Sequence, residues 1–168
     1  MRVALSPHPD TPSLTVSRIE VDVGREGGRL RLRYWIDGDT AKVRWPARAE
    51  PERTDGLWRH TCFEAFVQTA DGYHEFNMTI SGQWASYRFD SYRAGMAPAD
   101  EQVLFDIHEG RDNYMDLGFL VDIPRGPERL GLSAVIEDID GAVSYWALAH
   151  PSAKPDFHHP DSFILDLQ

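Results

Sequence analysis

The sequence predicts an all-β fold: an antiparallel β-sandwich of the jelly-roll or immunoglobulin-like kind, with about ten short strands and little helix. Three observations carry this prediction. Short runs alternate apolar and polar side chains with a period of two. Turns rich in Gly, Pro and Asp separate the runs, and no long stretch has the 3.6-residue periodicity of a helix.

Length and composition narrow the alternatives. A chain of 168 residues fits one domain with one core, which we place at residues 14–168 after an irregular, proline-rich lead-in at residues 1–13. The net charge of −10 has the wrong sign for a nucleic-acid partner. Cys62 is the sole cysteine, and no apolar run has the length of a signal peptide or a membrane span. We therefore expect a cytoplasmic protein with no membrane partner; the sequence carries no signal for an oligomeric state.

The period-two runs define the expected strands. They fall at residues 14–23, 29–36, 42–45, 62–68, 73–80, 84–90, 103–107, 114–121, 129–137 and 143–148, with an edge strand at 164–167. In the first run the apolar positions slip by one residue near Ser17, which indicates a β-bulge. The polar, proline-bearing segment 46–57 is expected to be a surface loop that walls a ligand cleft and delivers Trp58.

The central runs form two predicted hairpins, and their turns set the register. With Asp71-Gly72 and Ser81-Gly82 as two-residue turns, Glu75 lies opposite Arg88. One face of the three strands then collects polar and aromatic groups: Glu64, Gln68, Glu75, Asn77, Trp84 and Arg88.

This face is suited to a hydroxyl-rich ligand. Carboxylates, an amide and a guanidinium supply donors and acceptors, and an indole offers an apolar platform for the C–H face of a sugar ring. The alternative is an ordinary solvent-facing side of a sheet, with Glu75 and Arg88 as a cross-strand ion pair. We predict a carbohydrate-like small-molecule ligand, bound by Trp58, His60, Glu64, Glu75, Asn77, Trp84 and Arg88.

Two further site hypotheses follow from residue types. Glu64 and Glu75 on neighbouring strands have the composition of a glycosidase carboxylate pair, so a small glycoside hydrolase is the alternative function. Histidines and an acid crowd the proline-rich tail and form a candidate metal set, for which a network of turn hydrogen bonds is the favoured interpretation: His150, His158, His159 and Asp161.

The central residues also resemble a known family. The order Trp58, Cys62-Phe63-Glu64-Ala65-Phe66-Val67, Tyr73-His74-Glu75-Phe76-Asn77 and Gly82 is similar to the middle of the DOMON-like, family 9 carbohydrate-binding-module-like sandwiches. The tail from Lys154 to Asp161 resembles that of a bacterial subgroup whose members stand alone.

The resemblance implies a jelly-roll-like sandwich over nearly the whole chain and, for the wider superfamily, ligands such as sugars or haem. His60-Thr61 replaces the acidic pair that precedes the Glu strand in many of these modules, which argues against their calcium site. We therefore expect a non-catalytic carbohydrate-binding domain without a cofactor, with calcium or haem as the alternatives that the resemblance implies.

Overall fold

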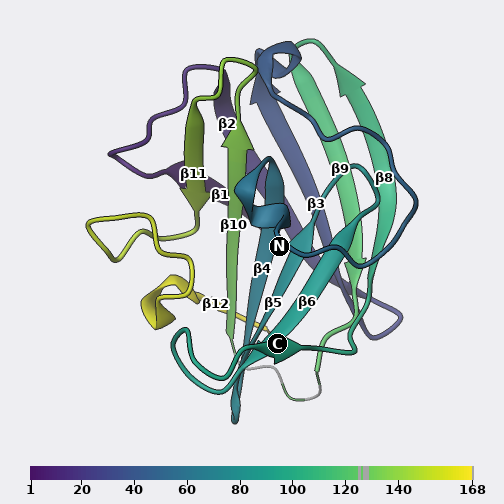
Figure 1. Cartoon of the computed structure of the whole chain (residues 1–168), viewed down its shortest axis with the longest axis vertical. Helices are drawn as coiled ribbons and strands as arrows, with labels where there is room; N and C mark the ends of the chain where they lie inside the picture. Colours follow the sequence, from purple (N-terminus) through teal and green to yellow (C-terminus); the bar gives the residue numbers. More distant parts are fainter. Residues whose placement is uncertain (125, 127–128, 168) are drawn as a thin grey trace.

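A computed structural model describes residues 1–124, 126 and 129–167, with the backbone alone at residues 106–108. It has two facing antiparallel layers (Figure 1). Sheet A consists, in spatial order, of β1 (Arg2–Pro7), β2 (Val16–Glu26), β3 (Arg29–Gly38), β9 (Tyr114–Val121) and β8 (Val103–Arg111). Sheet B consists of β7 (Ala97–Pro98), β6 (Trp84–Phe89), β5 (Gly72–Met78), β4 (Cys62–Thr69), β10 (Arg129–Glu137) and β11 (Val143–Ala147), and β12 (Leu165–Asp166) pairs with β10. The prediction of an all-β sandwich is confirmed.

The main core lies between the two sheets. Alternate residues of each strand point inward, so Ile19 and Tyr34 of sheet A meet Phe63 and Phe76 of sheet B, all with no exposed surface. Burial of a side chain of this size contributes about 1.5 to 3 kcal/mol. The alternating sequence pattern is therefore explained by one buried and one outward row per strand.

The N-terminal segment differs from the prediction. Residues 2–7 are not an irregular lead-in but strand β1, which pairs with β2 through Arg2–Leu5 and with β11 through Ser6 and Pro7. This strand joins the two sheets into one curled path. Pro7 is accommodated because it stands at the last position of the strand, where a missing backbone donor costs little.

Two local predictions in the first half have opposite outcomes. The expected bulge is confirmed, since the register between β2 and β3 shifts between Val16 and Arg18. The expected strand at 42–45 is wrong: a 3₁₀ turn, η1 (Thr40–Lys42), occupies its start, and Val43 makes one isolated bridge with Asp138. The Trp45 indole donates to the Thr40 carbonyl at 2.9 Å, which folds this short segment back on itself.

The first central hairpin turns one position earlier than predicted. Thr69 pairs with Gly72, so Ala70-Asp71 is the two-residue loop, and Glu64 lies opposite Asn77. Gly72 is therefore the first residue of β5, and the end of β6 lies against it. A Cβ at Gly72, whose φ is +134°, would stand 2.0 Å from the Phe89 carbonyl oxygen. This shift of two residues keeps Glu64, Glu75 and Asn77 on one face, as predicted.

The register of the second hairpin differs from the prediction and changes the site. Met78 pairs with Trp84, so the connection is the wider loop 79–83. Its side-chain hydroxyls replace strand pairing: Thr79 and Ser81 are hydrogen-bonded at 2.6 Å, and Ser81 Oγ accepts from the Gln83 amide at 3.1 Å. The register moves by one residue, which turns β6 over relative to the prediction.

Trp84 and Arg88 therefore lie on the opposite side of sheet B from Glu75 and Asn77, and the predicted pairing of Glu75 with Arg88 is wrong. Trp84 packs at partial exposure against the main core, with the Arg53 guanidinium 5.0 Å from its ring centre. Arg88 lies opposite His74.

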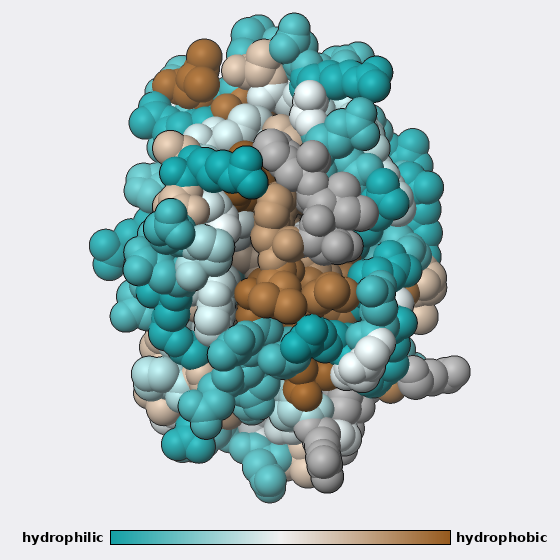
Figure 2. Space-filling model, turned by 90° about the vertical axis from the view of Figure 1, so that its right-hand side faces the viewer, coloured by the Kyte–Doolittle hydropathy of each residue, from teal (hydrophilic) through white to brown (hydrophobic). Residues whose placement is uncertain are grey.

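Loop 46–57 follows the edge of β6. Thr54 donates its amide to the Trp84 carbonyl at 2.9 Å, and Arg53 donates to the Ser86 carbonyl at 2.7 Å. Figure 2 views the molecule from the right-hand side of Figure 1, where β8 lies, and shows apolar side chains gathered within a hydrophilic surface. Trp84 and Phe105 are among the partly buried residues that extend the core outward.

Candidate functional site

A second, smaller apolar cluster lies on the outer face of sheet B, away from the sandwich core. Its buried members are Phe66, Tyr73, Ala85, Tyr87, Phe89 and Phe163, with Phe157 packed against them. Phe157 and Phe163 come from the C-terminal tail, drawn in yellow to the left of β10 (Figure 1). Gly131 permits this docking, because a Cβ there would stand 2.6 Å from the Phe163 ring. The tail therefore covers part of a face that would otherwise be open.

Beside this cluster the tail leaves a cavity of about 570 Å³. Sheet B forms its floor, and loop 90–97, the tail and the 3₁₀ turn η2 (Leu57–Arg59) form its walls. A volume of this size is typical of small-molecule sites. The cavity is lined by Trp58, Glu64, Glu75, Phe89, Arg93, Met96, Val135, Tyr145, Lys154, Pro155, Phe157 and His158.

Two carboxyl groups stand in the floor. Glu64 of β4 and Glu75 of β5 are 3% and 5% exposed. Ser133 Oγ donates to Glu64 at 3.4 Å, and the Asn77 amide donates to Glu75 at 2.8 Å. Burial raises the pKa of Glu75 to about 7, and burial together with the charge of Glu75 raises the pKa of Glu64 well above its usual range. The floor is thus able to hold or release a proton near neutral pH.

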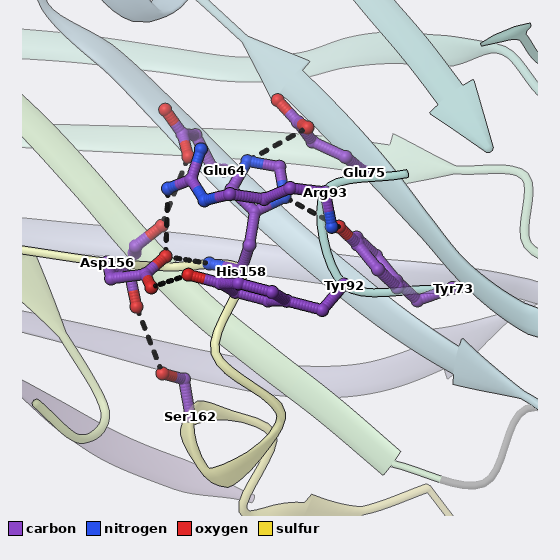
Figure 3. Close-up of polar contacts among 9 residues, drawn as sticks. Glu64, Tyr73, Glu75, Tyr92, Arg93, Asp156, His158 and Ser162 are labelled. Carbon is purple, nitrogen blue, oxygen red and sulfur yellow. Dashed lines mark hydrogen bonds and ion pairs between the residues drawn. The ribbon is translucent and has the colours of Figure 1, made fainter. Parts of the chain in front are cut away.

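His158 of the tail is held above this floor. Its Nδ1 is 2.8 Å from the Tyr73 hydroxyl, and its Nε2 is 3.6 Å from a Glu75 oxygen (Figure 3). The rings of Phe66 and Phe89 lie edge-on at 5.1 Å from it. Burial among these rings lowers the pKa of His158 to about 4, so the imidazole is neutral at pH 7.

An ionic clasp joins the tail to loop 90–97. Arg93 donates to Asp156 at 2.8 Å, and the Tyr92 hydroxyl donates to the other oxygen of that carboxylate (Figure 3). These bonds, outweighing partial burial, hold the pKa of Asp156 below its usual range. Arg93 has a φ of 53°, and its amide donates to the Tyr73 hydroxyl at 3.2 Å. The clasp closes one side of the cavity.

Aromatic rings supply the remaining walls. Trp58 is 37% exposed and lies edge-on to Tyr87 at 6.1 Å. Tyr145 of β11 and Phe157 of the tail meet at 6.0 Å in the same geometry. Lys154 is exposed at the cavity mouth. The lining therefore combines aromatic surfaces with a few convergent polar groups.

The structure brings only some of the predicted site residues together. Trp58, Glu64 and Glu75 line the cavity, and Asn77 supports Glu75 from below. His60 does not line it: its exposed ring contacts Glu137 at 2.7 Å. Trp84 and Arg88 belong to the other side of the sheet, because of the register shift in the second hairpin.

The tail histidines have separate partners. His150 Nε2 is 2.8 Å from the Ser6 carbonyl oxygen, and His159 lies 3.9 Å from Asp161 within its own turn. Of these three tail histidines, His158 is the one that lines the cavity. In the part of the chain that the structure describes, no three His, Cys, Asp or Glu side chains are grouped as metal ligands.

The sequence did not mark Tyr145, Lys154 and Phe157 as lining residues. They come from loops or from a distant strand, so no periodic pattern marks them. A signal was present in the unexplained apolar residues of the tail, Phe157 and Phe163, which require a surface to cover.

Comparisons with known proteins bear on the fold. No family model matches the sequence, and no curated protein matches it. A solved structure does: that of a "putative carbohydrate-binding protein" from Bacteroides uniformis, with a TM-score of 0.66 and 14% identity over 97% of this chain and 84% of that one. In addition, no helix among the described residues is long and apolar enough to span a membrane. At this identity the likeness shows a common fold.

Proposed function

We propose that this protein is a non-catalytic binding domain for a carbohydrate-like ligand, and that the ligand occupies the cavity under the tail. The observation that carries the proposal is the lining: buried carboxyl groups in the floor beneath the aromatic walls of Trp58, Tyr145 and Phe157. Sugar rings present apolar C–H faces and polar edges, and this combination matches both. The similarity in fold to the protein from Bacteroides uniformis supports the same assignment.

Calorimetric titration with a panel of mono- and oligosaccharides tests the proposal. We expect binding that weakens at least tenfold, about 1.4 kcal/mol, in Trp58→Ala. The matched control is Trp35→Ala, since Trp35 stacks with Arg2 at 4.3 Å on the other sheet. The absence of heat with every sugar, or equal losses in the two variants, would reject the assignment.

A second candidate is a small glycoside hydrolase that uses Glu64 and Glu75. The observation in its favour is that the pKa of each carboxyl group is raised inside a cavity, as a general acid requires. Turnover of aryl glycosides by the wild-type protein, lost in Glu64→Gln, would support the hydrolase. Sugar binding without turnover would leave the binding domain.

A further inference from the structure

Among the described residues, the two acids in the floor of the cavity have no paired lysine or arginine. Glu64 and Glu75 are more than nine-tenths buried and line the cavity. Within the described part of the chain, no lysine or arginine nitrogen comes within 4.0 Å of either carboxyl group, and the one ring nitrogen that does is His158 Nε2 at 3.6 Å. That histidine is neutral at pH 7, because burial lowers its pKa to about 4.

The nearby cations do not fill this gap. Arg93 is close enough to lower the pKa of both glutamates, but its guanidinium is paired with Asp156 at 2.8 Å. Lys154 stands at the exposed mouth. Glu64 receives only a long hydrogen bond, 3.4 Å from Ser133 Oγ, from the residues that the structure describes. Two buried acids therefore face a cavity without a counter-charge of their own.

Resting on the proposed function, we propose that the sugar bound in this cavity carries an ammonium group, which the Glu64 and Glu75 carboxylates receive. An ammonium group has three N–H donors and no acceptor, and ionised carboxylates only accept. Hydrogen bonds between such charged groups are about twice as strong as neutral ones, and more so away from water. The rings of Trp58, Tyr145 and Phe157 add electron-rich surface that favours a cation.

A neutral sugar fits this floor less well. With a neutral sugar the acids either stay protonated and make only neutral hydrogen bonds, or one of them ionises without a counter-charge. The preferred ligand class is therefore an amino sugar with a free amine, over the parent sugar or its N-acetyl form.

Binding of an ammonium group also has a proton signature. Glu75, with a pKa of about 7, is mostly protonated at pH 6.5, and the arriving cation stabilises its ionised form, so protons pass to the buffer. Among the described residues, the other titratable or charged groups around the pair or in the same lining are Cys62, Tyr73, Tyr87, Arg93, Tyr145, Lys154, Asp156 and His158. Tyr73 and Cys62 have raised pKa values and His158 a lowered one, so these three stay neutral at this pH and supply no protons.

The experiment is calorimetry at pH 6.5 with glucosamine, galactosamine and mannosamine, each against its parent sugar and its N-acetyl form, in two buffers of different ionisation heat. We expect at least one amino sugar to bind about tenfold or more tightly than its two neutral counterparts. We also expect proton release for that sugar alone. Glu75→Gln and Glu64→Gln should lose this preference, whereas Glu50→Gln, in the exposed loop, should keep it.

The outcomes separate the two proposals. Equal affinity for amino and neutral sugars, or preference without proton release, overturns the ammonium inference and leaves the binding function intact. A preference that persists in both glutamine variants also overturns it. No binding of any sugar overturns both. Proton release is measured on the wild-type protein, so the test stands even where a variant fails to fold.

Discussion

The raised pKa of Glu75 predicts that this residue makes the protein less stable as the pH rises from mild acid to neutral. Its pKa is about 7 in the folded protein against 4.5 for the free side chain, mainly because of burial. The folded state therefore holds a proton that the unfolded state gives up between pH 4.5 and 7. Stability contributed by this group falls as pH rises through that window and levels off above it.

The size of the effect follows from the shift. Each pKa unit corresponds to about 1.36 kcal/mol, so the fully developed cost is about 3 kcal/mol, most of which appears between pH 5 and pH 8. Glu64 acts in the same direction, since its pKa is also raised. His158 acts in the opposite direction: its pKa is lowered, so its contribution is lost as pH falls from 6.5 toward 4. The wild-type curve therefore sums contributions of opposite sign, and the Glu75 contribution must be isolated by substitution.

The assay is urea unfolding of the wild-type protein and Glu75→Gln at several values from pH 5 to pH 8. We expect the wild type to lose about 2 to 3 kcal/mol relative to the variant across this range. Glu50→Gln, at an exposed position, should run parallel to the wild type. A difference between wild type and Glu75→Gln that stays constant within about 0.5 kcal/mol would refute the reasoning, because it would mean that Glu75 ionises as it does in the unfolded chain.

Three other predictions address the packing around the cavity. Gly72→Ala should lower the free energy of unfolding by at least about 2 kcal/mol, since its Cβ would meet the Phe89 carbonyl at 2.0 Å. Gly141→Ala, with a positive φ but no atom within 4 Å, should lower it by about 1 kcal/mol. Equal urea midpoints of the two variants would contradict the hairpin register. Phe163→Ala should lower the free energy of unfolding by about 3 to 5 kcal/mol in the same assay, far more than Ile164→Ala at the exposed neighbouring position. Similar losses in the two variants would mean that the tail is not docked. Asp156→Asn should open the clasp with Arg93 and speed proteolysis of the tail several-fold. Asp161→Asn, which changes an exposed side chain, should leave the rate of proteolysis unchanged. Unchanged cleavage of Asp156→Asn would show that the clasp does not hold the tail.

The fold could be predicted from the sequence because its strands have two distinct faces. The alternation in β4 and β5 places Glu64, Glu75 and Asn77 on one side of the sheet. Although the predicted register was wrong by two residues, this placement is correct, since side chains two residues apart point to the same face. An error of one residue is different. In the second hairpin the hydroxyls of Thr79 and Ser81 widen the turn, and dipeptide rules that count Ser-Gly as a two-residue loop do not include them.

The cavity itself could not be predicted from local patterns. Its roof is an irregular tail that docks through Phe157 and Phe163 on strands far away in sequence, and such contacts leave no periodicity. Gly131 shows the same limit: nothing in the sequence distinguishes it within its strand, yet the Phe163 ring fits into the space left by its missing Cβ.

The one-residue shift also explains why the cavity has its chemistry. In the predicted register Arg88 would have stood opposite Glu75 and neutralised it. In the observed register Tyr87 takes that place, and Arg88 turns to the other side of the sheet. Tyr87 and Phe89 then give the tail an apolar surface on which to dock, while no lysine or arginine of the described residues pairs with the glutamates beside it. The same displacement of β6 thus creates both the roof of the cavity and the unpaired acids in its floor, which is why we look for the missing positive charge on the ligand.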